Sequence, residues 1–185
     1  MKLIHWNYFL ALEEDLLRLS RFVEFSRKNF RTYSLELAHL LLSSSSEIDV
    51  VLKSLCKPFA PAAKNESDYR SYIPRNIPNF TKIKVEIPRY ELAFQPWHSW
   101  NKNQTPAWWT AYNKVKHERN SHYDKANLKS VLQSMAGLFV CNIYLYKDMA
   151  NLGELSPWPH LFYPEDKHVK AITPGEAGWA LVCNL

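Results

Sequence analysis

WWTAYNKVKHERNSHYDKANLKSVLQSMAGLFVCNIYLY, residues 108–146, is the stretch that decides the fold. Its two halves show the three- and four-residue spacing of helices, and the densest polar cluster of the chain lies at the tight turn expected between them. We expect Thr105 to cap the first helix, Pro106 to occupy its first position, and Asp124 to cap the second helix. The second helix carries one broad apolar stripe, made by Leu128, Val131, Leu132, Met135, Leu138, Phe139, Ile143 and Tyr146.

The composition predicts one soluble globular domain over residues 1–185, because 46% of the residues are hydrophobic and 22% are charged. Only four glycines are present, which favours helices over a turn-rich β architecture. The net charge of +5 permits an acidic partner. It does not indicate nucleic acid, since acidic residues stand between most of the lysines and arginines.

The cysteines indicate a reducing compartment. Cys56, Cys141 and Cys183 are isolated and form no CxxC pair, so we predict buried free thiols, no zinc site and no cofactor. The best apolar run, residues 131–146, is shorter than the roughly 20 residues that span a bilayer, and acidic residues interrupt the apolar N-terminus. We therefore expect a cytoplasmic protein that does not enter a membrane.

All eleven prolines fall within residues 58–106 or residues 157–174. Because proline breaks helices, this distribution predicts proline-free helical blocks, an insertion at 58–106 and a packed C-terminal tail at 152–185. The first block predicts a helix over residues 4–28.

The second helix is predicted over residues 32–57, where four serines, Ser43 to Ser46, leave two alternatives. Ser46 and Asp49 could form a capping box that starts a new helix. Alternatively the helix continues, and the serines are small residues at a close packing point. The apolar spacing keeps its phase across the serines, which favours the continuous helix.

Alternating residues within the insertion predict a small hairpin. Apolar and charged side chains alternate over residues 82–87 and again over residues 90–94, so Pro88 should lie at the turn or on an edge. Four tryptophans follow, and they could stack on bases or lock a loop onto the helices. We favour the structural role for this set: Trp97, Trp100, Trp108 and Trp109.

The polar cluster between the central helices has a functional and a structural interpretation. It contains Asn113, Lys116, His117, Arg119 and His122, with Glu47, Asp49 and Lys53 on the preceding helix as companions. Two cations and two imidazoles could hold a phosphate, and histidine could move protons. In the alternative, which these residues alone favour, Asn113 and His117 hydrogen-bond across the bundle and the cations lie at a helix C-terminus.

Several enzyme templates do not fit. His117 and His122 are five residues apart, which turns the second histidine about 140° around a helix from the first, so a zinc-protease motif is absent. A metal-dependent enzyme would rest on this pair alone. The sequence has no glycine-rich phosphate loop, no Gly-x-Ser-x-Gly elbow and no evident pair of catalytic carboxylates. No metal site is predicted.

The string WWTAYNKVKHER, the Ala-Asn-Leu helix start and MAGLFV together resemble bacterial HEPN-like (higher eukaryotes and prokaryotes nucleotide-binding) helical proteins. YSLELAHLLLSSSSEIDVVLKSLC is similar to their second helix, so the resemblance covers most of residues 30–147. It implies a four-helix bundle in a superfamily that contains many RNases and RNA-binding modules of toxin–antitoxin and phage-defence systems.

Catalytic HEPN domains carry an arginine followed four to six residues later by a histidine. In this chain Arg119 and His122 are too close together, and Arg31 and His39 are too far apart. The usual RNase residues therefore cannot be assigned, and the catalytic residues stay unknown.

These observations predict a mainly α protein: a HEPN-like four-helix bundle with a small β or irregular insertion between helices two and three. The expected function is that of a cytosolic protein that binds RNA or a nucleotide, as a degenerate RNase of a defence or toxin–antitoxin system. The alternative is a non-catalytic module for protein interaction or homodimerisation. Asn142, within the apolar stripe, is expected to hydrogen-bond to another helix or to ordered water.

Overall fold

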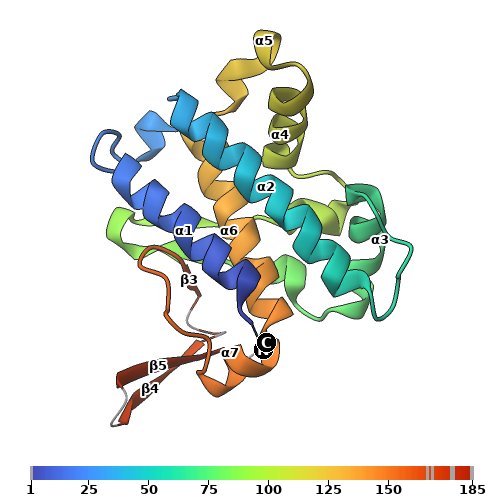
Figure 1. The fold of residues 1–185 in the computed structure, drawn as a ribbon, viewed down its shortest axis with the longest axis vertical. Helices are drawn as coiled ribbons and strands as arrows, with labels where there is room; N and C mark the ends of the chain where they lie inside the picture. The colour runs from blue at the N-terminus through green and yellow to red at the C-terminus, as the bar shows by residue number, and fades with distance from the viewer. Residues whose placement is uncertain (1, 166, 168, 176–177, 184–185) are drawn as a thin grey trace.

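The computed structural model describes residues 2–165, 167, 169–175 and 178–183, and shows a mainly helical chain with a small antiparallel sheet (Figure 1). The helices are α1 (Ile4–Leu19), α2 (Leu35–Cys56), α3 (Glu66–Asn76), α4 (Ala107–His117), α5 (Arg119–His122), α6 (Leu128–Leu145) and α7 (Lys147–Leu152). The prediction of a mainly α protein is confirmed. Helices α2 and α6 form the central pair, which α1 and α4 flank.

Helix α2 is continuous through its serines, so the capping-box alternative is wrong. The Ser34 hydroxyl caps the helix by accepting a hydrogen bond from the Leu37 amide at 3.2 Å. Further along, the Ser44 and Ser134 hydroxyl oxygens lie 2.6 Å apart across the α2–α6 interface. A Cβ atom on Gly137 would lie only 3.3 Å from the Trp108 ring. Ser44 and Ser45 are buried small residues at this close packing point, as the favoured alternative predicts, whereas Ser46 is exposed.

Helix α1 is shorter than predicted and ends at Leu19 instead of residue 28. The Ser20 hydroxyl donates to the Leu17 carbonyl at 2.7 Å, which satisfies one of the carbonyls that the helix end leaves free. The chain then turns, and Phe25 becomes buried against Tyr90 with ring centroids 4.9 Å apart. Burial of this ring outweighs the helical periodicity of the residues around it.

The start of α4 differs from the prediction by one residue and by its cap. Pro106 is the N-cap of α4 rather than its first residue, and no side chain caps the helix. The Thr105 hydroxyl instead donates to Glu66 on α3 at 3.0 Å. Thr105 therefore makes a tertiary contact with α3 in place of the capping contact that the local sequence predicts.

The connection between α4 and α6 is longer than the predicted tight turn. Helix α5 and a 3₁₀ turn, Tyr123–Lys125, intervene. The cap of α6 is Asn127, whose side-chain oxygen accepts from the Ser130 amide at 3.1 Å, so the assignment of Asp124 as the cap is wrong. The α4–α5 segment forms one end of the molecule (Figure 1).

The insertion contains the predicted hairpin and a helix that was not predicted. Strands β1 (Val85–Ile87) and β2 (Leu92–Phe94) pair antiparallel, with Pro88 in the turn between them, which confirms the hairpin. Helix α3 begins where the Asn65 side chain accepts from the Asp68 amide at 3.1 Å. Helix α3 was not predicted because Pro74 lies inside it and Pro78 follows shortly after, and proline usually breaks helices.

The first part of the tail, up to residue 164, is held to the rest of the chain by two sets of contacts. Strand β3 (Tyr163–Pro164) pairs with β1, giving the strand order β2-β1-β3. The Glu13 carboxylate of α1 is 1% exposed and accepts the amides of His160, Leu161 and Phe162 at 2.9, 2.8 and 3.4 Å. Beyond this point β4 (Val169–Gly175) pairs with β5 (Gly178–Cys183).

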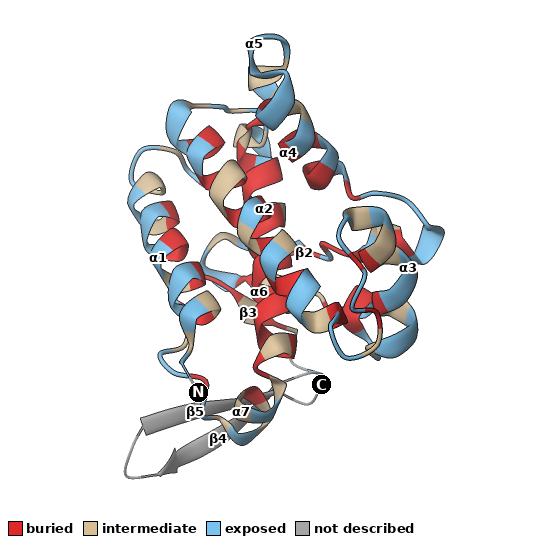
Figure 2. Cartoon of the chain, turned by 45° about the vertical axis from the view of Figure 1, so that its right-hand side comes forward, coloured by how far each residue is buried: buried red, intermediate tan, exposed pale blue. Residues whose placement is uncertain are grey.

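The core runs along α6, which is buried over most of its length (Figure 2). Among the described residues, α6 is the one helix long and apolar enough to cross a membrane, and 78% of that window is buried inside the fold. Such burial is typical of the core helix of a soluble protein. Cys56 and Cys141 are buried free thiols, as predicted, whereas the side chain of Cys183 lies outside the described residues.

Asn142 is fully buried, but its partner differs from the one expected. Its side-chain amide donates to the Leu138 carbonyl of the same helix at 3.0 Å, rather than to another helix. The side-chain oxygen has no hydrogen-bond partner among the residues that the structure describes.

The tryptophans of the insertion and of α4 are buried, with exposed fractions of at most 5%, which supports the structural role over a base-stacking platform. Their indole N–H groups bond inside the protein: Trp97 to the Gly137 carbonyl at 3.3 Å and Trp108 to the Pro96 carbonyl at 3.1 Å. The rings therefore lock the insertion onto the helical pair.

Candidate functional site

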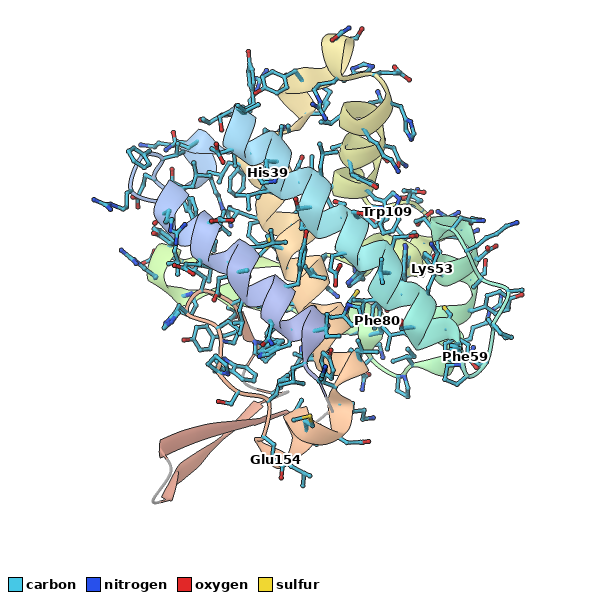
Figure 3. All side chains as sticks on the ribbon, viewed as in Figure 1. His39, Lys53, Phe59, Phe80, Trp109 and Glu154 are labelled. Atoms are coloured by element: carbon cyan, nitrogen blue, oxygen red, sulfur yellow. The ribbon has the colours of Figure 1, made fainter. Side chains whose placement is uncertain are left out.

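An open cleft of about 510 Å³ lies where α2, α3 and α4 meet. Figure 3 shows Trp109 on α4 close to α2, and Lys53 further along α2 towards α3. The cleft is lined by Ser46, Asp49, Lys64, Asn65, Glu66, Ser67, Trp109, Tyr112, Asn113 and Lys116. Three residues of the predicted cluster, Asp49, Asn113 and Lys116, thus come together.

Asp49, the α2 carboxylate of this cleft, is compensated by its neighbours. Lys53 contacts one of its oxygens at 2.6 Å, and the Tyr69 hydroxyl donates to the other at 2.9 Å. Burial, together with this hydrogen bond, raises the pKa of the Tyr69 phenol well above its ordinary range. Tyr69 therefore stays a neutral donor, and Asp49 contributes little free negative charge to the cleft.

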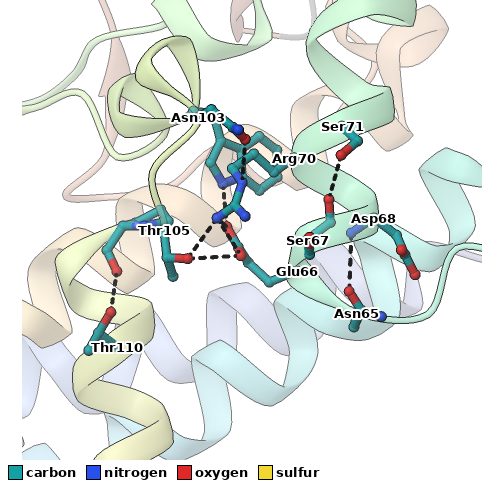
Figure 4. A network of polar contacts seen from close by, with 11 residues as sticks. Asn65, Glu66, Ser67, Asp68, Arg70, Ser71, Asn103, Thr105 and Thr110 are labelled. Atoms are coloured by element: carbon teal, nitrogen blue, oxygen red, sulfur yellow. Dashed lines mark hydrogen bonds and ion pairs between the residues drawn. The ribbon is translucent and has the colours of Figure 1, made fainter.

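Glu66, the α3 carboxylate, is held in a polar network at the first turn of its helix (Figure 4). Arg70 contacts it at 2.9 Å, and the Trp100 indole and the Thr105 hydroxyl donate to it at 2.8 and 3.0 Å. Arg70 also donates to the Asn103 side chain at 3.0 Å. The network fixes α3 to the start of α4 and neutralises Glu66.

The two lysines of the cleft have no such compensation. Neither the Lys64 nor the Lys116 ammonium group has an ion-pair partner among the described residues, although the Lys64 backbone amide donates to the Asp68 carboxylate at 3.0 Å. The Lys116 ammonium lies 5.4 Å from the centre of the Tyr112 ring. The first two amides of α3, those of Glu66 and Ser67, also lack acceptors within the described part of the chain. The cleft lining therefore includes two lysines without an ion pair and the first two residues of α3, a combination that favours an anion.

The remaining members of the predicted cluster lie elsewhere. His117 and Arg119 line a second hollow of about 500 Å³ on the α4–α5 side, which shares Lys116 with the cleft. His122 contacts Glu118 at 3.2 Å. Glu47 pairs with His5 at 2.5 Å, between α2 and α1. The chain turns after α4 ends, and this turn separates side chains that are close in sequence.

The structural interpretation of Asn113 and His117 is wrong in its detail. Both side chains are exposed, and neither hydrogen-bonds across the helices within the described structure. The predicted cluster does not contain Lys64, Asn65 and Ser67, because they lie at or just before the start of the unexpected helix α3. The available signal was the capping pattern of Asn65 followed by Asp68 three residues later.

The lining of the cleft combines lysine, amide, hydroxyl and aromatic side chains with two paired carboxylates. Within the described residues, no group of three or more His, Cys, Asp or Glu side chains could hold a metal ion. No family model matches the chain, and comparisons with curated proteins and with solved structures find no similar protein. The cleft is therefore interpreted from its own charges and geometry.

Proposed function

We propose that the α2–α3–α4 cleft binds the phosphate groups of RNA or of a nucleotide. The observation that carries this proposal is the convergence of Lys64, Lys116 and the free first-turn amides of α3 on one cleft, whose two carboxylates are already paired. Charged donors to phosphate form hydrogen bonds roughly twice as strong as neutral ones. Helix N-termini add backbone donors and a favourable dipole.

The proposed contacts favour the phosphate backbone over the bases. Trp109 and Tyr112 line the cleft but are 5% and 7% exposed, so they offer ring edges rather than a free stacking face. Asn113 is exposed on the same wall and can donate or accept through its amide. Binding should therefore depend on salt more than on base sequence.

We infer binding without cleavage as the activity of this site. The Arg–His pair of HEPN RNases is absent from the sequence, and His117 and His122 lie outside the cleft lining. The interlocked α1, α2, α4 and α6 are proposed to be a HEPN-like four-helix bundle. A cytosolic, degenerate RNase of a defence or toxin–antitoxin system is the role that suits this combination.

Fluorescence anisotropy with a labelled oligouridylate of about ten nucleotides tests the proposal, with uridine monophosphate as competitor. Lys116→Ala and Lys64→Ala should each weaken binding by about fivefold or more and lower the salt slope by about 0.7, because each removes one phosphate contact. The melting temperature should stay unchanged, since Lys116 is exposed.

Lys2→Ala is the matched control, because it removes the same charge from an exposed position that does not line the cleft. Equal losses in all three variants would show general electrostatic attraction instead of a site. The absence of oligouridylate binding by the parent protein at low salt would refute the proposal.

A further inference from the structure

A second groove, of about 360 Å³, runs beside strand β2 and shares no lining residue with the α2–α3–α4 cleft. We call it the β2 groove. Its lining consists of Arg27, Phe30, the segment 92–95, Lys129 and Gln133. Three parts of the chain form it: the turn after α1, the second strand of the hairpin and the first turns of α6.

The groove is built from fixed elements. The Lys129 amide donates to the Phe30 carbonyl at 3.3 Å, which ties the start of α6 to the turn that carries Arg27. The Phe30 and Phe94 rings lie 6.1 Å apart and form an aromatic floor. Gln95 is anchored through its side-chain amide to the Thr81 carbonyl at 3.1 Å.

The charge of the β2 groove is of one sign. Arg27 and Lys129 are exposed, and neither has a carboxylate partner among the described residues. No aspartate or glutamate lines the groove. Two cations without a carboxylate partner in one groove attract an anionic occupant and disfavour a basic one.

The strand beside the groove has a free edge. Within the described sheet β2 pairs only with β1, so its other side offers unpaired backbone groups. Alternate residues of an antiparallel strand point their amide and carbonyl groups to that side. An extended peptide can pair with such an edge, and phosphate or a folded surface would leave it unused.

We propose that the β2 groove binds an extended acidic peptide segment of a partner protein, which adds a strand beside β2 and places carboxylates on Arg27 and Lys129. The free edge supplies backbone hydrogen bonds, the two phenylalanines accept an apolar side chain, and the cations select glutamate or aspartate at alternating positions. This inference is independent of the proposed phosphate cleft, because the two sites have no residue in common.

The test uses a labelled peptide of about eight residues that alternates glutamate and valine, with an alternating lysine–valine peptide as its matched control. Anisotropy measures affinity, and the ¹⁵N chemical shifts of residues 93–95 locate binding. The acidic peptide should bind and shift these amides. Arg27→Glu and Lys129→Glu should each weaken binding by about tenfold or more, because each creates a like-charge contact.

Two control variants test whether a loss of peptide affinity is caused by the β2 groove itself. Lys2→Glu makes the same charge change far from the groove and should alter affinity by less than about twofold. Lys116→Ala should leave peptide binding intact even if it abolishes oligouridylate binding. The thermal melts of the charge-reversal variants should match the parent, since both side chains are exposed.

Three results would overturn the inference: no binding of the acidic peptide, equal binding of the lysine–valine peptide, or chemical shifts confined to residues outside the groove. Displacement of the peptide from the groove by oligouridylate, with loss in Lys129→Glu, would assign the groove to nucleic acid and would also overturn the proposal.

Discussion

The α2–α6 interface and the α2–α3–α4 cleft use neighbouring residues of one helix in opposite ways. Ser44 faces α6, where its hydroxyl contacts Ser134 at 2.6 Å and the Leu40 carbonyl at 2.7 Å. Ser46, half a turn further along, is exposed and lines the cleft. At the interface, the Ser44 and Ser134 hydroxyls hydrogen-bond inside the protein. In the cleft, the Lys64 and Lys116 ammonium groups have no ion pair among the described residues and can contact a ligand.

A structural interface and a candidate binding site can therefore be distinguished by whether their polar groups already have partners inside the protein. The Ser44 and Ser134 hydroxyls of the interface have partners that would be lost on mutation, so substitution of either serine should cost stability. Unpaired groups in the cleft cost little to remove, and their substitution should change binding instead. Stability measurements on both regions can therefore test the assignment without knowledge of the ligand.

The largest expected effect is that of Trp97→Ala, which breaks the packing around α6. The Trp97 ring is fully buried beside Gly137, Trp100 and Trp108, and its N–H donates to the Gly137 carbonyl. Removal of a buried tryptophan should lower the free energy of unfolding by about 3–5 kcal/mol. Chemical denaturation measures this loss, with the 83% exposed Phe22, changed to alanine, as the control. A cost below about 1 kcal/mol would contradict the assigned core.

A smaller effect on stability is expected from alanine substitution of Ser44 and of Ser46. Ser44→Ala should destabilise by about 1 kcal/mol, because it removes a buried hydrogen bond that links α2 to α6. Ser46→Ala should change stability by less than about 0.5 kcal/mol, since that side chain is exposed. Denaturation midpoints of the pair give the difference. Equal effects would erase the distinction between interface and cleft.

The smallest expected effect concerns pH and the buried carboxylate at the tail. Burial raises the pKa of Glu13 above its ordinary value of 4.5, and hydrogen bonds from the amides of residues 160–162 lower it only in part. Since the folded-state pKa is the higher one, the linked stability is complete below the unfolded pKa and is lost as pH rises through the folded pKa.

The parent protein should therefore lose stability relative to Glu13→Gln as pH rises from about 4 to about 7. The difference in the free energy of unfolding between parent and variant, measured across that range, tests this sign. A difference that stays constant, or that grows in favour of the parent with rising pH, would contradict the raised pKa.

The long helices and the hairpin were predictable because their apolar residues recur at helical or strand spacing, and these same residues are buried in the structure. Helix α2 continues through its serines because the apolar spacing stays in phase, and the hairpin follows from the alternation around Pro88. Capping residues were less predictable. Both Thr105 and Asp124 are chemically suited to cap, but Glu66 engages Thr105 and Asn127 caps α6.

Half of the candidate site could be predicted from helical spacing, and the other half could not. Asn113 and Lys116 share a face of α4, so their joint position followed from the sequence. Lys64 reaches the cleft only because α3 folds back against α2, a tertiary arrangement that local patterns do not encode. His117 and Arg119 were grouped with them because they are close in sequence. Helix α4 ends at His117, and both residues line a different hollow.

The Glu13 contact also has a consequence for the order of events on the ribosome. The carboxylate is near the start of the chain, and the three amides that it binds are almost 150 residues later, at 147 to 149 positions of separation. Helix α1 leaves the ribosome well before the tail, and its acidic group must stay hydrated until residue 162 has left the exit tunnel. The α1 face can therefore close only after residue 162 has been synthesised, and nascent chains ending before residue 160 should expose the surface that Glu13 later covers.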